Sequence, residues 1–168
     1  MPIHIRRQVE AQEVPKELLD LSFAYLDAAD ELNSVLVSRP AASSFHRGQV
    51  ILWLSFHASE LVLKASILRL APAEKVKGHS LRRLTQKLRS LRPDALFEPP
   101  FQKMALPPYP GLVKKAEHES DAVGEALRYP VDNLGTPWPG PRGFSPDLFK
   151  ATLDRLRSEF EGLRTLLF

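Results

Sequence analysis

Residues 56–70 read FHASELVLKASILRL, and this stretch decides the fold. Apolar side chains occupy nearly every face of the helix that it predicts, and such a helix normally lies at the centre of a bundle. His57, Glu60 and Lys64 interrupt the apolar surface at intervals of three and four. Because a helix turns by about 100° per residue, these side chains project within roughly 60° of one another. The stretch therefore predicts a central helix with one polar stripe.

The polar stripe has two interpretations. Glu60 and Lys64, four residues apart in the favourable order, can form an ion pair in the core, and an unpaired buried charge would be costly there. Alternatively, the stripe faces a ligand. The opposite face carries small side chains on which another helix can pack closely, namely Ser55, Ser59 and Ser66.

Outward from this helix, the chain predicts other helices and no strand. The helical patterns cover residues 15–37, 45–70, 79–91 and 145–168, and residues 112–127 could form a fifth, short helix. In residues 15–37 the apolar positions, Leu21 among them, repeat with a period near that of a helix and form the face that we expect to point inward. Two proline-rich loops, 92–111 and 128–144, interrupt the helical patterns. We expect an all-α bundle of four to five helices in one domain over residues 1–168, with 1–13 as an irregular extension.

The composition excludes several classes of protein. The chain of 168 residues is 43% hydrophobic and has no cysteine, so it has neither disulfides nor a thiol nucleophile. It shows no long uncharged apolar run and no secretory signal. We expect a cytoplasmic protein without a membrane-spanning helix.

The positive charge is concentrated in one part of the chain. Residues 64–92 contain nine Lys or Arg and one acid, Glu74, although the whole chain has a net charge of only +3. The segment 75–92, with Arg82, Arg83 and Lys87 on its helix, can therefore bind a polyanion such as RNA or a nucleotide. The alternative is a solvated helix face without a ligand.

Two further motifs carry polar side chains. In GHSLRRL, residues 78–84, Gly78 permits a turn, and Ser80 is a better helix cap than His79. Arg128 and Tyr129 follow the acidic segment before them, and an Arg can hold a carboxylate or phosphate with two hydrogen bonds. Both motifs could equally be structural.

Metal and cofactor motifs are lacking. His57 and Glu60 could bind a metal with His79 or His118, but no HExxH pattern is present. No glycine-rich phosphate loop or nucleophile elbow occurs either. We expect neither a metal nor a cofactor.

Three motifs together resemble the HEPN superfamily of small all-α domains, mainly its uncharacterised prokaryotic branches. The E-x-x-x-K pair corresponds to Glu60 and Lys64, the G-H-x-L turn to residues 78–81, and the late R-Y-P to residues 128–130. The resemblance covers roughly residues 15–165. It implies a polar cluster of Glu60, Lys64, His79 and Arg128, and a homodimer.

Many HEPN domains are metal-independent endoribonucleases with an R-x(4–6)-H motif in a late helix. Here the only such spacing runs from Arg39 to His46, before the central helix, and no histidine follows Arg128. Whether the chain is an enzyme stays open, but this departure favours a non-catalytic domain that binds RNA, a nucleotide or a protein partner, as in defence or toxin–antitoxin-type systems. The alternatives are a ribonuclease that uses His79 or His57 with Arg128, and a structural interaction domain without nucleic acid.

Overall fold

The computed structural model describes residues 10–39, 44–98, 127 and 144–168. These residues form four α-helices and no strand, so the expected all-α bundle is confirmed. The helices are α1 (Val14–Ser38), α2 (Phe45–Leu70), α3 (Leu81–Leu91) and α5 (Pro146–Leu167). Their bounds lie within two residues of the predicted ones.

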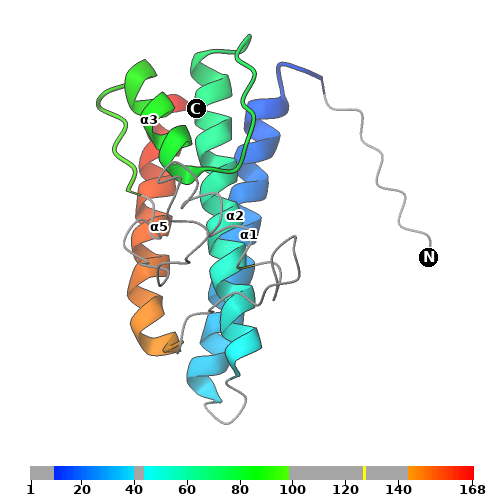
Figure 1. Cartoon of the computed structure of the whole chain (residues 1–168), viewed down its shortest axis with the longest axis vertical. Helices are drawn as coiled ribbons and strands as arrows, with labels where there is room; N and C mark the ends of the chain where they lie inside the picture. Colours follow the sequence, from blue (N-terminus) through cyan, green and yellow to red (C-terminus); the bar gives the residue numbers. More distant parts are fainter. Residues whose placement is uncertain (1–9, 40–43, 99–126, 128–143) are drawn as a thin grey trace, which may run out of the picture.

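The three long helices lie side by side, and the short α3 packs at one end of the bundle (Figure 1). α1 and α2 run in opposite directions and make the most extensive contact in the described part of the chain, while α5 runs parallel to α2. α2 contacts each of the other three helices. The helix that contains residues 56–70 is therefore the central one, as its sequence predicts.

Serine side chains cap the N-termini of three of the described helices. Ser44, Ser80 and Ser145 accept hydrogen bonds from the backbone N–H three residues later, at 3.3, 3.4 and 3.5 Å. The Ser80 cap places the start of α3 at Leu81, two residues beyond the predicted start at His79. Gly78 has a φ of 84°, the left-handed region that glycine enters without strain, so the chain turns there before α3 begins.

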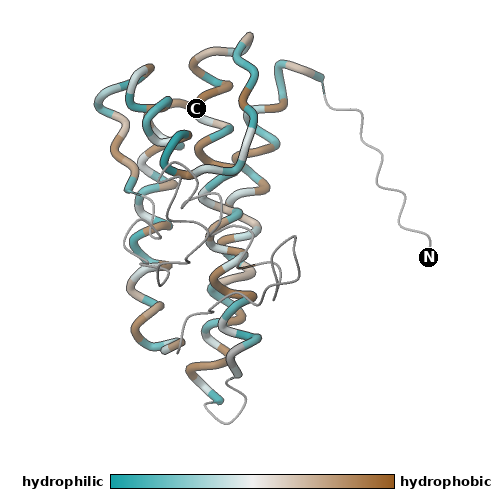
Figure 2. Tube along the Cα trace, in the orientation of Figure 1, coloured by the Kyte–Doolittle hydropathy of each residue, from teal (hydrophilic) through white to brown (hydrophobic). Residues whose placement is uncertain are grey.

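The core consists of apolar residues from every described helix. The largest fully buried side chains include Phe56 of α2 and Phe160 of α5, and both belong to a single hydrophobic cluster. Residues 46–70 are long and apolar enough to cross a membrane by composition alone, but 72% of the 18-residue window within them that meets this test is buried inside the bundle. Figure 2 shows hydrophobic and hydrophilic residues alternating along the helices, as expected where one side faces the core.

The serine stripe of α2 faces the interior of the bundle. Ser55, Ser59 and Ser66 are all fully buried, and each hydroxyl donates to the carbonyl four residues earlier at 2.8 Å. These internal bonds satisfy the hydroxyls without a partner from another helix. The stripe is therefore not available to a second copy of the chain.

One prediction for α1 is wrong. Leu21 was expected to face inward, yet its side chain is 45% exposed. The buried positions of α1 form a narrower stripe, which includes Leu19 and Leu26. The reason is that α1 lies at the edge of the bundle, where only α2 and α5 cover it among the described helices.

Several predictions lie outside the described residues. They concern residues 1–9 of the expected extension, most of the short helix at 112–127, and most of both proline-rich loops. Of residues 99–143 the structure describes only Leu127, which is buried and whose carbonyl accepts a hydrogen bond from Gln49 Nε2 of α2 at 3.3 Å.

Candidate functional site

Glu60 is the centre of a polar cluster, which we call the Glu60 cluster and which comprises His57, Glu60, Lys64 and His79. Glu60 Oε1 accepts a hydrogen bond from Lys64 Nζ at 2.7 Å. The same oxygen lies 2.9 Å from His79 Nδ1, although 19 residues separate the two along the chain. The second oxygen, Oε2, lies 3.7 Å from His57 Nδ1. The structure thus brings together the polar stripe of α2 and the histidine of the GHSL turn.

The members of the cluster differ greatly in exposure. The Glu60 side chain is only 2% exposed, and those of Lys64 and His57 are 18% and 21% exposed. His79 is 57% exposed, because it belongs to the loop that precedes α3 rather than to a helix. A buried carboxylate is therefore linked to the surface through His79.

The electrostatics of the cluster keep Glu60 ionised. Burial alone raises the pKa of its carboxyl group, but the nearby His57, the hydrogen bond from Lys64 and the positive charges around the carboxylate outweigh that effect. The net result lowers the pKa of Glu60 from 4.5 to about 2. At neutral pH the carboxylate is therefore negatively charged and acts only as a hydrogen-bond acceptor.

Aromatic rings hold His57 in place. Its imidazole stacks on Trp53 of the same helix, with ring centroids 5.5 Å apart and planes 7° apart. Tyr25 of α1 meets the same imidazole edge-on, with centroids 4.8 Å apart. His57 is thus packed between two helices, which suits a structural role better than that of an acid–base group.

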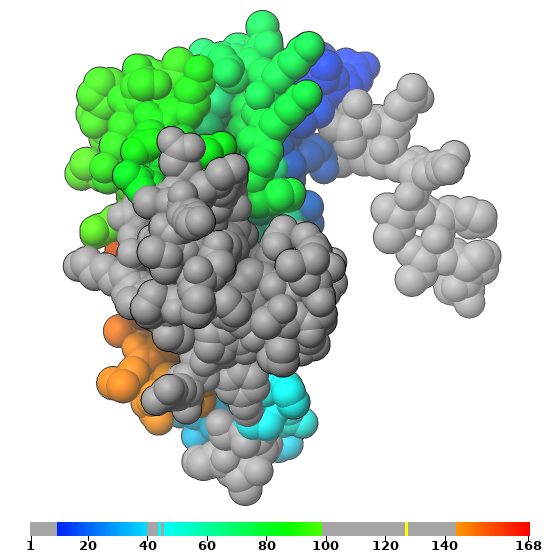
Figure 3. All heavy atoms as spheres, viewed as in Figure 1, coloured from blue at the N-terminus to red at the C-terminus, as the bar shows by residue number. Residues whose placement is uncertain are grey.

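The second candidate feature is a group of cations around α3. Leu81, Leu84 and Leu88 of α3 are buried, so the charged residues of this helix are held on its outer side. Five cations of the 75–92 segment are exposed. The four other than Arg89 form what we call the basic α3 surface, namely Lys75, Lys77, Arg82 and Arg83. In the space-filling view, α3 and the loop before it lie at the surface of one end of the molecule (Figure 3).

Other cations of the segment are already engaged. Lys87 Nζ lies 3.1 Å from Glu74, and Arg92 Nε lies 2.7 Å from Asp94. Arg89 donates to the carbonyl of Phe97 at 3.4 Å. By contrast, Lys75, Lys77 and Arg82 form no ion pair with any residue in the described ranges. Lys87, predicted as a binding residue, thus has part of its charge balanced within the chain.

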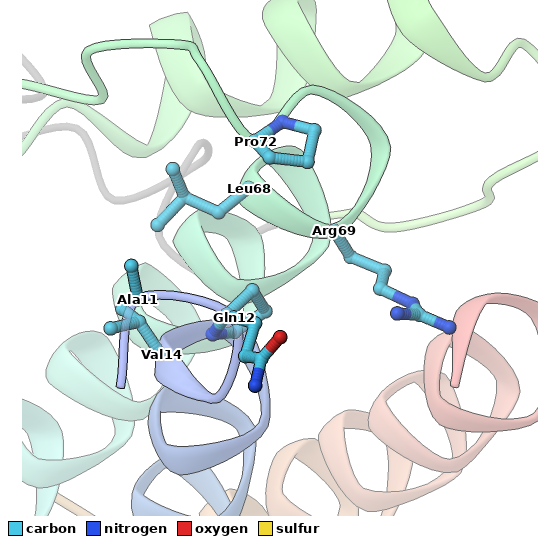
Figure 4. Close-up of a pocket in the computed structure, with 7 residues that line it drawn as sticks. Ala11, Gln12, Val14, Leu68, Arg69 and Pro72 are labelled. Carbon is cyan, nitrogen blue, oxygen red and sulfur yellow. The ribbon is translucent and has the colours of Figure 1, made fainter. Parts of the chain in front are cut away.

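A cavity of about 330 Å³ lies elsewhere, between the start of α1 and the end of α2. Its lining is mostly apolar and includes Val14 and Leu68. Arg69 also lines it, but this side chain reaches away from those two residues (Figure 4), and its Nε donates to the carbonyl of Leu167 in α5 at 2.9 Å. The cavity shares no lining residue with the Glu60 cluster or the basic α3 surface.

The remaining predicted site residues are Arg128 and Tyr129, and both lie outside the described residues. The part of the chain that the structure describes contains no group of three His, Asp or Glu side chains arranged to hold a metal ion. Tyr25 is the residue near the cluster that sequence reasoning missed. Its only signal is its place in the apolar periodicity of α1, which does not reveal a partner on α2.

Comparisons of the chain with protein-family models, with curated proteins and with solved structures find no match. The resemblance to the HEPN superfamily therefore rests on the three short motifs and their order along the chain.

Proposed function

We propose that this chain is a non-catalytic, HEPN-like helical domain that binds RNA through the basic α3 surface. The observation that carries the proposal is the charge of residues 75–92, which include seven Lys or Arg and no Asp or Glu. A helix that buries its leucines and exposes its cations can follow a phosphate backbone without reading a base sequence.

The state of the Glu60 cluster supports the non-catalytic part of the proposal. Lys64 is mostly buried, and its Nζ forms an ion pair with Glu60 Oε1 at 2.7 Å. His57 is packed against Trp53 and Tyr25. Two of the three polar residues of the α2 stripe therefore have structural partners that account for their presence.

RNA is a better candidate than an acidic protein for one physical reason. Each phosphate that replaces its counterions with a protein cation gives a favourable, salt-dependent contribution, and single-stranded RNA can bend to meet several cations. With four cations in contact, the logarithm of the association constant should fall against the logarithm of the salt concentration with a slope of roughly −3.

A metal-independent endoribonuclease is the second candidate, and one observation favours it. His79 is more than half exposed and lies 2.9 Å from a buried carboxylate, which is an arrangement suited to proton transfer. In this alternative His79 is the acid–base group, and Arg128 is the phosphate ligand that the resemblance implies.

The homodimer is part of the proposal through the resemblance alone. Since the serine stripe is buried, a dimer would need another surface, and the exposed Leu21 and Val35 of α1 are apolar residues available for it. Light scattering of the purified protein would give its mass in solution.

One experiment separates the candidates. The purified chain is incubated with mixed RNA, with and without EDTA, and both cleavage and binding are measured over a range of salt concentrations. Salt-sensitive binding without cleavage is the expected result. Cleavage that persists in EDTA and is lost in His79→Ala and Arg128→Ala would establish the ribonuclease instead. Absence of binding even at low salt would favour an interaction domain without nucleic acid.

A further inference from the structure

His79 has a feature that RNA binding does not require. Its ring is 57% exposed, yet its Nδ1 is 2.9 Å from the oxygen of a carboxylate that is 2% exposed. Because Glu60 is ionised at neutral pH, with a pKa of about 2, it can only accept a hydrogen bond. The hydrogen of the neutral imidazole is therefore on Nδ1, and the lone pair is on Nε2.

The carboxylate prepares Nε2 for reaction. A carboxylate that accepts from one ring nitrogen fixes the tautomer and the orientation of the imidazole, and it raises the basicity of the other nitrogen. The carboxylate of Glu60 has a fixed position, since Glu60 lies in the middle of α2 and its Oε1 also accepts a hydrogen bond from Lys64 at 2.7 Å. His79 thus differs from a freely rotating surface histidine.

The charges around His79 favour an anionic reaction partner. Lys64 shares a carboxylate oxygen with His79, so its ammonium group is close to the imidazole. Arg82 and Arg83 follow His79 in the first turn of α3 and are exposed. An incoming phosphoryl group would therefore meet positive charge, and residues 75–92 contain no acid to repel it.

We propose that Nε2 of His79 is a phosphoryl-acceptor site, modified by donors with an activated phosphorus–nitrogen bond. The Nε2 lone pair attacks phosphorus, and the bond between phosphorus and the donor nitrogen breaks. The donor nitrogen keeps the electron pair, takes a proton from water and leaves as ammonia or an amine. The Nδ1 hydrogen stays on the ring, and Glu60 balances the positive charge that develops on the imidazole. This inference goes beyond the proposed function and does not depend on RNA binding.

The test uses the full chain and potassium phosphoramidate at about pH 8, where an ordinary histidine is neutral. Because phosphohistidine is acid-labile, intact mass and fragment masses are measured under neutral or alkaline conditions. N-acetylhistidine, whose imidazole has no carboxylate partner, is the reference. We expect His79 to be modified about tenfold faster than N-acetylhistidine, a factor of the size that a carboxylate partner of a histidine contributes. His79→Gln should abolish the fast phase, and His46→Gln should leave it unchanged.

Two further measurements make the result decisive. In the wild-type chain, NMR should find the phosphoryl group on Nε2 and not on Nδ1, because Nδ1 is occupied by Glu60; this readout needs no variant that could fail to fold. Glu60→Gln, if circular dichroism shows it folded, should slow the modification of His79 by about tenfold. Equal rates at His79 and N-acetylhistidine, or modification of His79 at Nδ1, would overturn the proposal.

Discussion

His79 Nδ1 lies 2.9 Å from Glu60 Oε1, so the loop that precedes α3 is fastened to the middle of the central helix. The same oxygen accepts from Lys64 one turn further along α2. The polar stripe of α2 is therefore explained by interactions within the chain, because the charges of Glu60 and Lys64 balance each other. His79 is the most exposed member of the cluster, and residues of the basic α3 surface flank it in sequence.

Reversing one charge on the basic α3 surface should weaken RNA binding. Arg82 is exposed and has no ion-pair partner in the described part of the chain. We expect Arg82→Glu to lower the affinity for single-stranded RNA about tenfold at low salt and to make the salt dependence less steep by about one unit. Fluorescence anisotropy with a labelled oligonucleotide measures both quantities.

The matched control is Arg39→Glu, which makes the same charge change at an exposed position at the end of α1, far from α3 (Figure 1). It should alter RNA affinity far less than Arg82→Glu. Equal losses in the two variants would mean that only the net charge of the chain matters, and the assignment of the surface to α3 would have to be abandoned.

Removing the charge of Glu60 should destabilise the fold. In Glu60→Gln the ammonium of Lys64, which is 18% exposed, loses its anionic partner. We expect the free energy of unfolding to fall by about 2–4 kcal/mol, the range for breaking a largely buried ion pair. Urea denaturation followed by circular dichroism measures this change.

Two comparisons identify the cause of that loss. The double variant Glu60→Gln, Lys64→Met leaves no unpaired charge and should recover part of the stability. Asp20→Asn, at an exposed position of α1, should change the unfolding free energy by no more than about 0.5 kcal/mol. If Glu60→Gln were as mild as Asp20→Asn, the ion pair would have no energetic importance.

The same carboxylate predicts how stability depends on pH. The folded chain lowers the pKa of Glu60 from 4.5 to about 2, so the unfolded chain binds the proton more tightly. The resulting stabilisation is complete above about pH 4.5 and is lost as the pH falls toward 2. It amounts to about 3 kcal/mol.

Other carboxylates also titrate in this range, so the informative quantity is the difference between wild type and Glu60→Gln. That difference in unfolding free energy should shrink as the pH falls from about 6 to 3, because Glu60 of the unfolded wild-type chain takes up a proton in this range while the folded carboxylate stays ionised. A difference that stays constant over this range would contradict the lowered pKa.

Much of the fold could be predicted because its signals are local. The Ser80 and Ser145 caps, the prolines at helix starts and the apolar periods depend on residues a few positions apart, and they locate the described helices within two residues. The pair of Glu60 and Lys64 is predictable for the same reason, since one helical turn brings the two together.

What could not be predicted depends on how the helices pack. Periodicity shows which side of α1 faces inward but not how wide its buried stripe is, and so Leu21 was placed wrongly. The contact of Tyr25 with His57 depends on the register of α1 against α2, which no local pattern specifies. The approach of His79 to Glu60 was expected only through the family resemblance, because a loop of unknown path separates them.

The last prediction concerns two glycines, at which the same substitution to alanine should have opposite effects on the free energy of unfolding. A Cβ on Gly48 would lie 2.6 Å from Cγ of Phe144, while a Cβ on Gly162 would meet nothing within 4 Å. Gly48 lies near the start of α2, where the chain preceding α5 crosses it, and the atoms in the way include Phe144 Cβ, which cannot move without the backbone. Gly162 is exposed within α5.

Gly48→Ala should therefore lower the free energy of unfolding by about 1–3 kcal/mol, since Phe144 must be displaced from the core that it packs against. Gly162→Ala should raise it by about 0.5–1 kcal/mol, because alanine loses less backbone entropy in a helix. Urea denaturation of both variants under the same conditions measures the two effects. Because the substitution is the same at both glycines, helix propensity alone would stabilise both variants. If Gly48→Ala were stabilised, Phe144 would not pack against α2 in this way.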